Sequence, residues 1–541
     1  MAEIFVIKDE DIPSIESIPV SETIEPSDLK KNSDGVEEKT RKLIVKNKED
    51  NSNHYEPSKN GAESPPKDDN ENAVNIRNSR TSSMTTIVNS ISIDETPLAE
   101  TSRGMVAMSI SLDIEKEIHQ ERAIKRKERF EAIVQNENVS LSFREGIFYL
   151  IGIVLIGFSS TLTLSLIPAH DVVQFPEYWY ELLFQGPSGL MIWTVLNICI
   201  IRPGLLLNVD CVFGWKNVFF VLLVSFLHQE FMIVSSYYLW TRIFGYKWPI
   251  PFFGFIMSIE GLMYEFPLIW IRFPQEYRSN GEFRKRMRNF YTIDLYIRAL
   301  IIIYQAIVEY IGESSEDYQP IVALTLPIMR EISIWIVSKL IARCSNGDNK
   351  GAEIFLKYYI AAFHTIVVCY VIGSYTTTTT TWTLIGFDFL INVMISIWIA
   401  WKKRSDPSNM DAQINLLIDL AIYELVEFHA PLSYILVIFV AYHGPNATIL
   451  GNVLNSYWKY TAIENIEKTL LNMIMFFFVD FSSTLVTGSI LWVFSRINLW
   501  KLFVDLQKEF RVPFCVALGS QLVLVSNIFD NLKRNFEFLC F

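Results

Sequence analysis

The chain has 541 residues, of which 50% are hydrophobic and 14% aromatic, and its formal net charge is −12. A chain this long and this apolar is too large for one soluble domain. Its six cysteines show no CxxC or Cys/His metal spacing, which excludes a disulfide scaffold and a zinc finger. Residues 1–143 hold 28 acidic and 19 basic side chains, so the acidic balance belongs mainly to this N-terminal region.

The N-terminal region lacks sustained hydrophobic periodicity. Residues 1–112 are rich in Ser, Asn, Glu, Lys, Asp and Pro, and such a segment buries too little apolar area to offset the entropy of ordering it. We therefore predict a disordered, charged tail over 1–143, with a juxtamembrane helix near 113–134. The first residues show no basic stretch followed by an apolar core, so we expect no cleaved signal peptide.

From residue 144 to the last residue, 541, apolar runs recur at the length an α-helix needs to cross a bilayer, about twenty residues. Eleven runs lie near 146–168, 188–210, 216–240, 249–271, 291–312, 320–342, 354–374, 382–401, 414–442, 469–494 and 512–530. They predict an all-α, polytopic integral membrane bundle of 10–11 transmembrane helices over 144–541.

The loops between these runs alternate in charge. Lys and Arg gather in 272–288, 339–350, 401–404 and 496–511, whereas the intervening loops hold few bases. Because cytoplasmic loops carry the excess of Lys and Arg, this pattern predicts that the N-terminus and the basic loops are cytoplasmic. The glycosylation acceptor Asn446, in the sequence Asn-Ala-Thr, falls in a loop assigned to the outside.

Several ionisable residues lie inside the apolar runs, where each is costly and by default a functional hypothesis. They are Glu230, Glu260, Glu265, Asp294, Arg298, Glu309, Arg330, Glu331, Lys357, His364, Asp388, Asp419, Glu424, Glu427, His429 and Asp480. Asp294 and Arg298 are four residues apart and can neutralise each other on one helical face. Arg330 and Glu331 are adjacent, so they need partners on other helices. Lys357 is close enough to a cytoplasmic end to extend its ammonium to the interface.

The run that contains Pro431 carries the strongest candidate site. Glu424 and Glu427 are three residues apart and share a helical face, and proline leaves the carbonyl of Glu427 without its helical donor. Two carboxylates and a free carbonyl predict an oxygen cluster for a cation or proton if it lines a polar cavity. Glu260 and Glu265, in the run near 249–271, are further candidates for the path of an ion or proton through the membrane. His429 faces away from Glu427, and we expect it to bond a neighbouring helix.

A structural interpretation stands beside this hypothesis. The run is longer than the bilayer requires, so Asp419 and Glu424 can lie at the cytoplasmic interface, and Glu427 with Pro431 can mark an ordinary kink. In that case the acids serve helix pairing only.

Motifs of known enzymes are missing: there is no phosphate loop, HExxH, GxSxG or kinase signature. We therefore expect no enzyme, no cofactor, no catalytic residue and no protein-ligated metal centre of a familiar kind.

Two stretches resemble an uncharacterised polytopic membrane protein family that is abundant in protist genomes, oomycetes especially. They are LTLPIMREISIWIVSKLIAR at 324–343 and ELVEFHAPLSYILVIF at 424–439, followed by GPNA at 444–447. The likeness spans roughly residues 320–510. It implies a multi-helix membrane protein with a variable cytoplasmic tail, and it brings no assigned substrate or catalytic residue.

Together these features favour a channel or transporter for an ion or small solute. The alternative is a membrane receptor or scaffold that signals through its cytoplasmic tail, and an intramembrane enzyme is a third, weaker interpretation. The expected partners are the lipid bilayer, a cation or proton, and cytosolic proteins that bind the tail; no nucleic acid is expected.

Overall fold

The computed structural model divides into two units, Met1–Ala107 and Met108–Phe541, and all the residues it describes lie in the second. The described residues are 121, 124–125, 128–132, 143–166, 195–207, 215–243, 267–344, 350–374, 377–405, 410–443 and 462–539. They are helical apart from short turns, with no strand among them. The predicted disordered tail over 1–112 lies outside the described residues. Within the predicted juxtamembrane helix, the described positions between 121 and 132 are helical.

Seven helical segments in the described part of the chain are long and apolar enough to cross a membrane. They are α4 (Phe143–Leu166), α11 (Gly281–Glu313), α12 with α13 (Gln319–Ala323 and Thr325–Cys344), α14 (Lys350–Ser374), α15 (Thr378–Ser405), α16 (Met410–His443) and α18 (Ala462–Ser495). A helix is the form that satisfies its own backbone groups in lipid, which explains why these apolar runs are helical. The protein is therefore an all-α, multi-pass integral membrane protein, as predicted.

The other predicted runs are described only in part. The run near 188–210 contains η2 (Leu196–Ile201) and α7 (Arg202–Leu207), and the run near 216–240 contains α8 (Trp215–Tyr237), followed by η4 (Tyr238–Ile243). The run near 249–271 falls mostly outside the described residues. The run near 512–530 lies inside α19 (Leu499–Leu539), and the short α10 (Gln275–Ser279) precedes α11.

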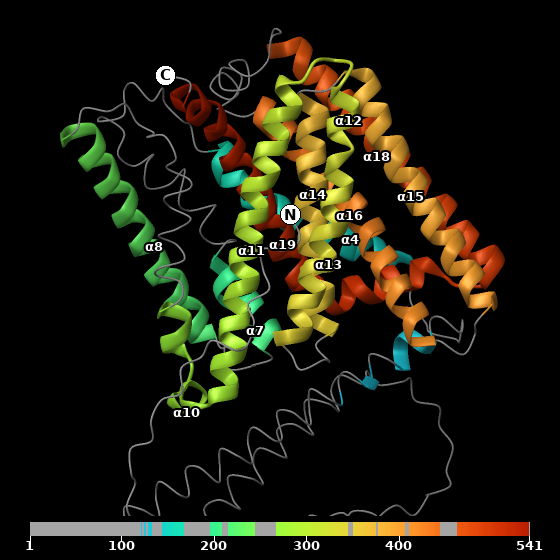
Figure 1. The fold of residues 1–541 in the computed structure, drawn as a ribbon, viewed down its shortest axis with the longest axis horizontal. Coiled ribbons are helices and arrows are strands. Elements are labelled where there is room, and N and C mark those ends of the chain that lie inside the picture. Colours follow the sequence, from blue (N-terminus) through green and yellow to red (C-terminus); the bar gives the residue numbers. More distant parts are fainter. Residues whose placement is uncertain are drawn as a thin grey trace, which may run out of the picture. The chain divides into compact units, whose positions relative to one another are not determined.

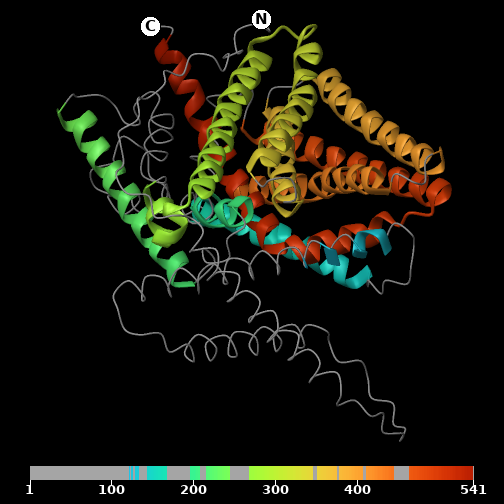
Figure 2. The same cartoon turned by 60° about the horizontal axis from the view of Figure 1, so that its bottom comes forward.

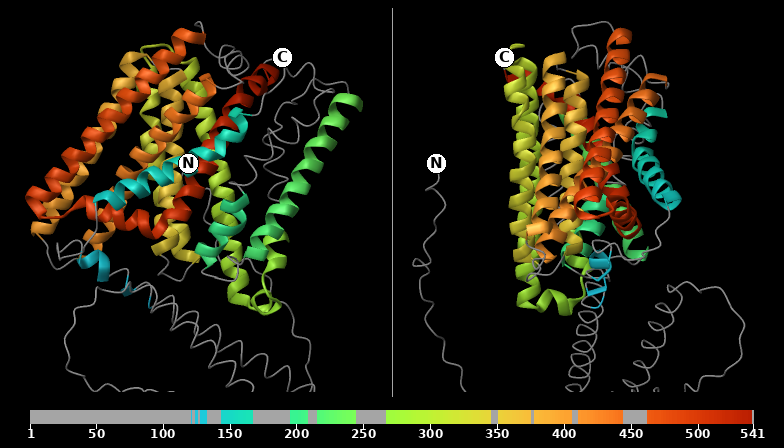
Figure 3. Two further views of the ribbon diagram at one scale, coloured as in Figure 1. Left: turned by 180° about the vertical axis from the view of Figure 1, so that it is seen from behind. Right: turned by 90° about the vertical axis from the view of Figure 1, so that its right-hand side faces the viewer.

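Helix α14 occupies the centre of the bundle (Figure 1). It packs against α13, α16, α18 and α19, and the whole of its most apolar stretch is buried inside the protein. Helices α15 and α18 run side by side along one flank, as Figure 3 also shows. Figure 2 shows α8 at the opposite edge of the bundle, where its large apolar side chains are exposed. Exposed apolar helix faces of this kind are suited to lipid, whereas the most apolar stretch of α14 contacts only protein.

The basic segments gather at one end of the bundle. The Asn289 side chain, near the start of α11, donates to the carbonyl of Arg343 at the end of α13, 3.0 Å away. Lys403, at the end of α15, donates to the carbonyl of Ser495 at the end of α18, 2.9 Å away. The ends of the helices that carry the predicted cytoplasmic bases are therefore neighbours, as alternating loops require.

The opposite end is held by uncharged groups. The side-chain oxygen Oε1 of Gln319 accepts from the backbone amide of Thr377, 3.0 Å away, and from the hydroxyl of Thr380, 3.1 Å away. The Thr469 hydroxyl donates to the carbonyl of Gly373 at the end of α14, 2.7 Å away. The two ends of the bundle thus differ in charge.

Close packing joins α4 to α19. A Cβ atom added at Gly146 would lie 2.6 Å from a methyl group of Val504, and one added at Gly157 would lie 2.8 Å from a methyl group of Leu518. Lipid supplies no hydrophobic drive for helix association, so membrane helices associate through close packing. Small residues permit that close approach. Helix α19 is kinked at Phe510, three residues before Pro513.

Candidate functional site

Three carboxylates from three different helices meet inside the bundle. Asp388 of α15, Glu427 of α16 and Asp480 of α18 each offer an oxygen, and these oxygens lie within 4.8 Å of one another. Glu427 and Asp480 are only 2% and 4% exposed. We call these three residues the acid cluster.

The acids of α15 and α18 lie on helix faces that carry further polar residues. On α15, Asp388, Asn392 and Ser396 follow at intervals of four, which puts them on one face. On α18, Asp480 is followed by Thr484 and further buried hydroxyl residues at helical spacing. Because α15, α16 and α18 contact one another, these polar faces can turn inward together while apolar faces meet lipid.

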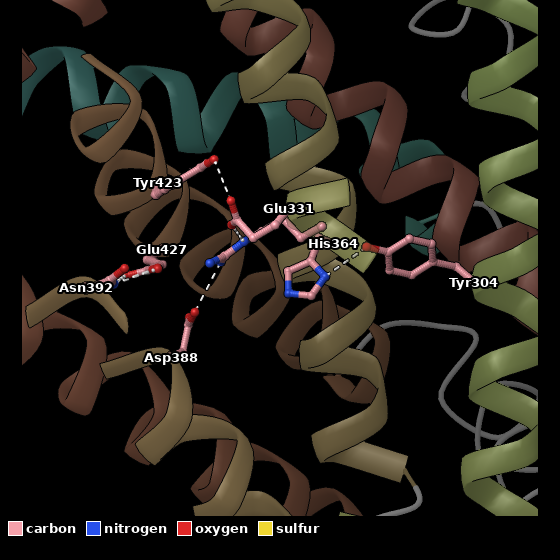
Figure 4. Close-up of polar contacts among 8 residues, drawn as sticks. Tyr304, Glu331, His364, Asp388, Asn392, Tyr423 and Glu427 are labelled. Carbon is pink, nitrogen blue, oxygen red and sulfur yellow. Dashed lines mark hydrogen bonds and ion pairs between the residues drawn. The ribbon is translucent and has the colours of Figure 1, made fainter. Parts of the chain in front are cut away.

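The carboxylate of Glu427 is bound by the amide of Asn392. The Asn392 Nδ2 donates to both carboxylate oxygens, 3.0 Å from Oε1 and 2.9 Å from Oε2 (Figure 4). Asn392 is 1% exposed, and its Oδ1 has no hydrogen-bond partner among the described residues. A buried carbonyl-type oxygen therefore lies beside the acid cluster.

Glu424 lies one turn before Glu427 but is not part of the acid cluster. Its Oε2 accepts a hydrogen bond from the hydroxyl of Thr484 on α18, and its Oε1 has no partner in the described part of the chain. The expectation that Glu424, Glu427 and the carbonyl freed by Pro431 form one oxygen cluster stays a prediction. Both are fully buried or nearly so, but each binds a different neighbouring helix.

A buried arginine supplies positive charge at the edge of the acid cluster. Arg330 of α13 is 1% exposed, and its Nη1 lies 3.2 Å from Oδ1 of Asp388. Its Nε also contacts Glu331 at 3.1 Å, and its guanidinium lies 4.9 Å from the ring centroid of Tyr423. Figure 4 shows the Tyr423 hydroxyl directed toward Glu331, whose Oε2 is 3.5 Å away. The predicted need for a partner on another helix is met for Arg330 by Asp388.

Two intramembrane histidines have structural partners. The Nδ1 of His429 is 2.9 Å from the Tyr358 hydroxyl of α14, which confirms that His429 bonds a neighbouring helix. The Nδ1 of His364 is 3.1 Å from the Tyr304 hydroxyl of α11 (Figure 4). These pairs connect α14 to α16 and to α11, and neither pair includes a residue of the acid cluster.

Other buried charges form ion pairs. Asp294 pairs with Arg298 at 2.9 Å, as predicted, and also with Arg202 at 2.5 Å. Lys357 is 7% exposed and pairs with Asp419 at 2.7 Å and with Glu353 at 2.8 Å, and its extension to the interface stays a prediction. This lysine pairs with a partly exposed acid on the neighbouring helix, which offsets the desolvation cost of the lysine.

Three predicted positions cannot be placed. Glu260 and Glu265 lie outside the described residues, so their proposed membership of an ion path stays a prediction. Asn446 also lies outside them, three positions after α16 ends at His443.

The charges near the acid cluster do not balance. Ionised Asp388, Glu427 and Asp480 carry three negative charges, and Arg330, which also pairs with Glu331, supplies at most one positive charge. Glu424 adds a fourth carboxyl group within one turn of Glu427. Since unpaired charge is expensive to bury, these acids must take up protons or a cation. Their arrangement is therefore suited to binding positive charge inside the membrane domain.

Comparisons of the chain with protein-family models, curated proteins and solved structures returned no match.

Proposed function

We propose that the protein is a channel or transporter that moves a cation or protons across the membrane. The observation that carries the proposal is the acid cluster, in which three helices bring carboxylates together inside a membrane domain. Intramembrane acids that face the bundle interior are typical of ion pathways and proton relays. Helix pairing alone needs no excess of acids over bases.

The contrast with Lys357 and Asp419 supports this proposal. There, the buried Lys357 pairs with the partly exposed Asp419, with 2.7 Å between the nitrogen and the oxygen, and with Glu353 at 2.8 Å. The acid cluster instead has one arginine for three carboxylates, and Asp480 Oδ2 has no hydrogen-bond partner among the described residues. Exchange of a proton or cation at such a site changes its charge without breaking a structural ion pair.

The proposed orientation places the basic end of the bundle, with the loop 272–288, in the cytoplasm. The N-terminal region is then cytoplasmic as well, where it is available to cytosolic proteins. The excess of Lys and Arg at one end supports this, because such residues are retained on the cytoplasmic side.

Flux measurements in sealed vesicles test the proposal. The purified full chain is reconstituted with an internal dye for protons or for Ca²⁺, and a gradient is imposed. Wild type is expected to dissipate at least one gradient faster than protein-free vesicles do. Glu427→Gln keeps the size of the side chain and removes its charge, so it is expected to abolish that difference. Absence of flux for wild type, or wild-type flux for Glu427→Gln, would overturn the proposal.

A further inference from the structure

We propose that Asp388, Glu427 and Asp480 bind a single divalent cation with the oxygen preference of Ca²⁺. This deepens the proposed function by naming the ion for the same site, and it rests on that function only for the role of the ion in transport. The binding itself follows from the geometry, the neighbouring oxygens and the charge of the acid cluster.

The spacing of the acid cluster fits one ion. Ca²⁺ binds oxygen ligands at 2.3–2.6 Å, so two ligands on opposite sides of the ion are about 5 Å apart. The oxygens of Asp388, Glu427 and Asp480 all lie within 4.8 Å of one another. Mg²⁺ requires shorter bonds in a stricter octahedron, so ligands from three separate helices suit the more flexible geometry of Ca²⁺ better.

Unpartnered oxygens beside the acid cluster independently indicate a ligand. Asn392 Oδ1 and Asp480 Oδ2 are buried and have no hydrogen-bond partner in the described part of the chain. The Asn392 amide is held by its two bonds to Glu427, so its Oδ1 lies next to the Glu427 carboxylate. A buried acceptor without a donor is unfavourable, and coordination of a cation removes that cost.

The chemistry of these ligands favours a hard cation. Carboxylate and amide oxygens suit Ca²⁺, Mg²⁺ and Mn²⁺, whereas Zn²⁺ and copper sites use thiolate or imidazole ligands. Neither Cys nor His belongs to the acid cluster. The Nδ1 atoms of His364 and His429 are instead directed at tyrosines.

The charge count favours a divalent ion over a monovalent one. Glu331, which also pairs with Arg330 at 3.1 Å, is left out of this count. Three ionised carboxylates with Arg330 then leave two negative charges, which one divalent ion neutralises, with Glu424 in its protonated form. A monovalent ion would leave one charge buried and unpaired. Arg330 contacts only the Asp388 side of the acid cluster, so Glu427 and Asp480 stay available to the ion.

Binding to the purified full chain in detergent tests this inference, with Mn²⁺ as the spectroscopic probe and Ca²⁺ as its competitor. Titration runs to about 1 mM, the weak end of Ca²⁺ affinities in proteins. Wild type is expected to bind one equivalent of Mn²⁺ that Ca²⁺ displaces. Asp480→Asn and Glu427→Gln should each weaken binding by more than about tenfold, because even groups behind metal ligands typically contribute tenfold or more.

Matched variants distinguish ligand loss from misfolding. Asp419→Asn removes a partly exposed acid of α16 that pairs with Lys357, and Glu353 still pairs with that lysine at 2.8 Å. It is expected to bind Mn²⁺ as wild type does, and Asp480→Glu, which keeps the charge, should retain more affinity than Asp480→Asn. Ca²⁺ should also raise the melting temperature of the wild-type protein, and this measurement requires no variant.

The outcomes separate this inference from the proposed function. No Mn²⁺ or Ca²⁺ binding by wild type, or undiminished binding by both charge-removing variants, would overturn the divalent site. Proton flux without divalent binding would also overturn the divalent site, but it would support the proposed function. Divalent binding without any flux would support the site and overturn the transport proposal.

Discussion

Arg330 on α13 and Asp388 on α15 form a buried ion pair, with 3.2 Å between Nη1 and Oδ1. The pair connects the acid cluster to a helix that contributes no carboxylate to it. Among the described residues, no other base forms an ion pair with Asp388, Glu427 or Asp480. Arg330 therefore compensates one of the three acids and leaves the other two for a proton or a cation.

Replacing Arg330 tests this compensation. Arg330→Gln leaves Asp388 without its counter-charge, and breaking a buried pair typically costs about 3–5 kcal/mol. Adding Asp388→Asn to Arg330→Gln removes the unpaired charge, so we expect the double variant to be more stable than Arg330→Gln alone. Unfolding of the four proteins in detergent measures the coupling. A double variant as unstable as the sum of both single variants would contradict the pairing.

The glycines of α4 give a prediction about packing on α19. At Gly157, an added Cβ would lie 2.8 Å from Leu518 Cδ2 and 2.9 Å from its Cγ, whereas at Gly152 nothing lies within 4 Å. Gly152→Ala should raise stability, because Ala is favoured over Gly in a helix by up to about 1 kcal/mol. Gly157→Ala should lower it, since overpacking costs about 1–3 kcal/mol. Melting temperatures that change in the same direction would show that α4 and α19 are not closely packed at Gly157.

Helix type and most span boundaries follow from local sequence. An apolar run of bilayer length has one stable backbone form in lipid, so α11, α14 and α18 could be predicted without tertiary information. The Asp294–Arg298 pair follows equally from spacing along one helix. Likewise, the position of His429 relative to Glu427 required only the helical period.

The acid cluster could not be predicted in this way. Asp388 and Asp480 were recognised as intramembrane acids, but nothing local indicates that they face Glu427. Lipid is as apolar as the bundle interior, so hydrophobicity alone does not tell the lipid face of α15 or α18 from its packed face. The available signal was the polar stripe from Asp388 through Asn392 to Ser396, which marks an inward face at a spacing of four.

Membrane orientation gives a further prediction. The basic end, including the loop 272–288, is expected in the cytoplasm and Asn446 outside. In a secretory expression system, Asn446→Gln should remove the glycan at this position. The untreated variant should therefore migrate faster on a gel than the untreated wild type. Protease added to intact cells should leave the loop 272–288 uncut. Cleavage in that loop from outside would reverse the proposed orientation.

The central claim is that acids from three helices form one transport site, and flux through single-charge variants tests it most directly. Asp388→Asn, Glu427→Gln and Asp480→Asn are reconstituted at equal amounts beside wild type and Asp419→Asn, and proton and Ca²⁺ flux into vesicles is recorded. We predict that all three cluster variants fall to the rate of protein-free vesicles, while Asp419→Asn retains the wild-type rate. Wild-type flux that persists in all three cluster variants would contradict the claim.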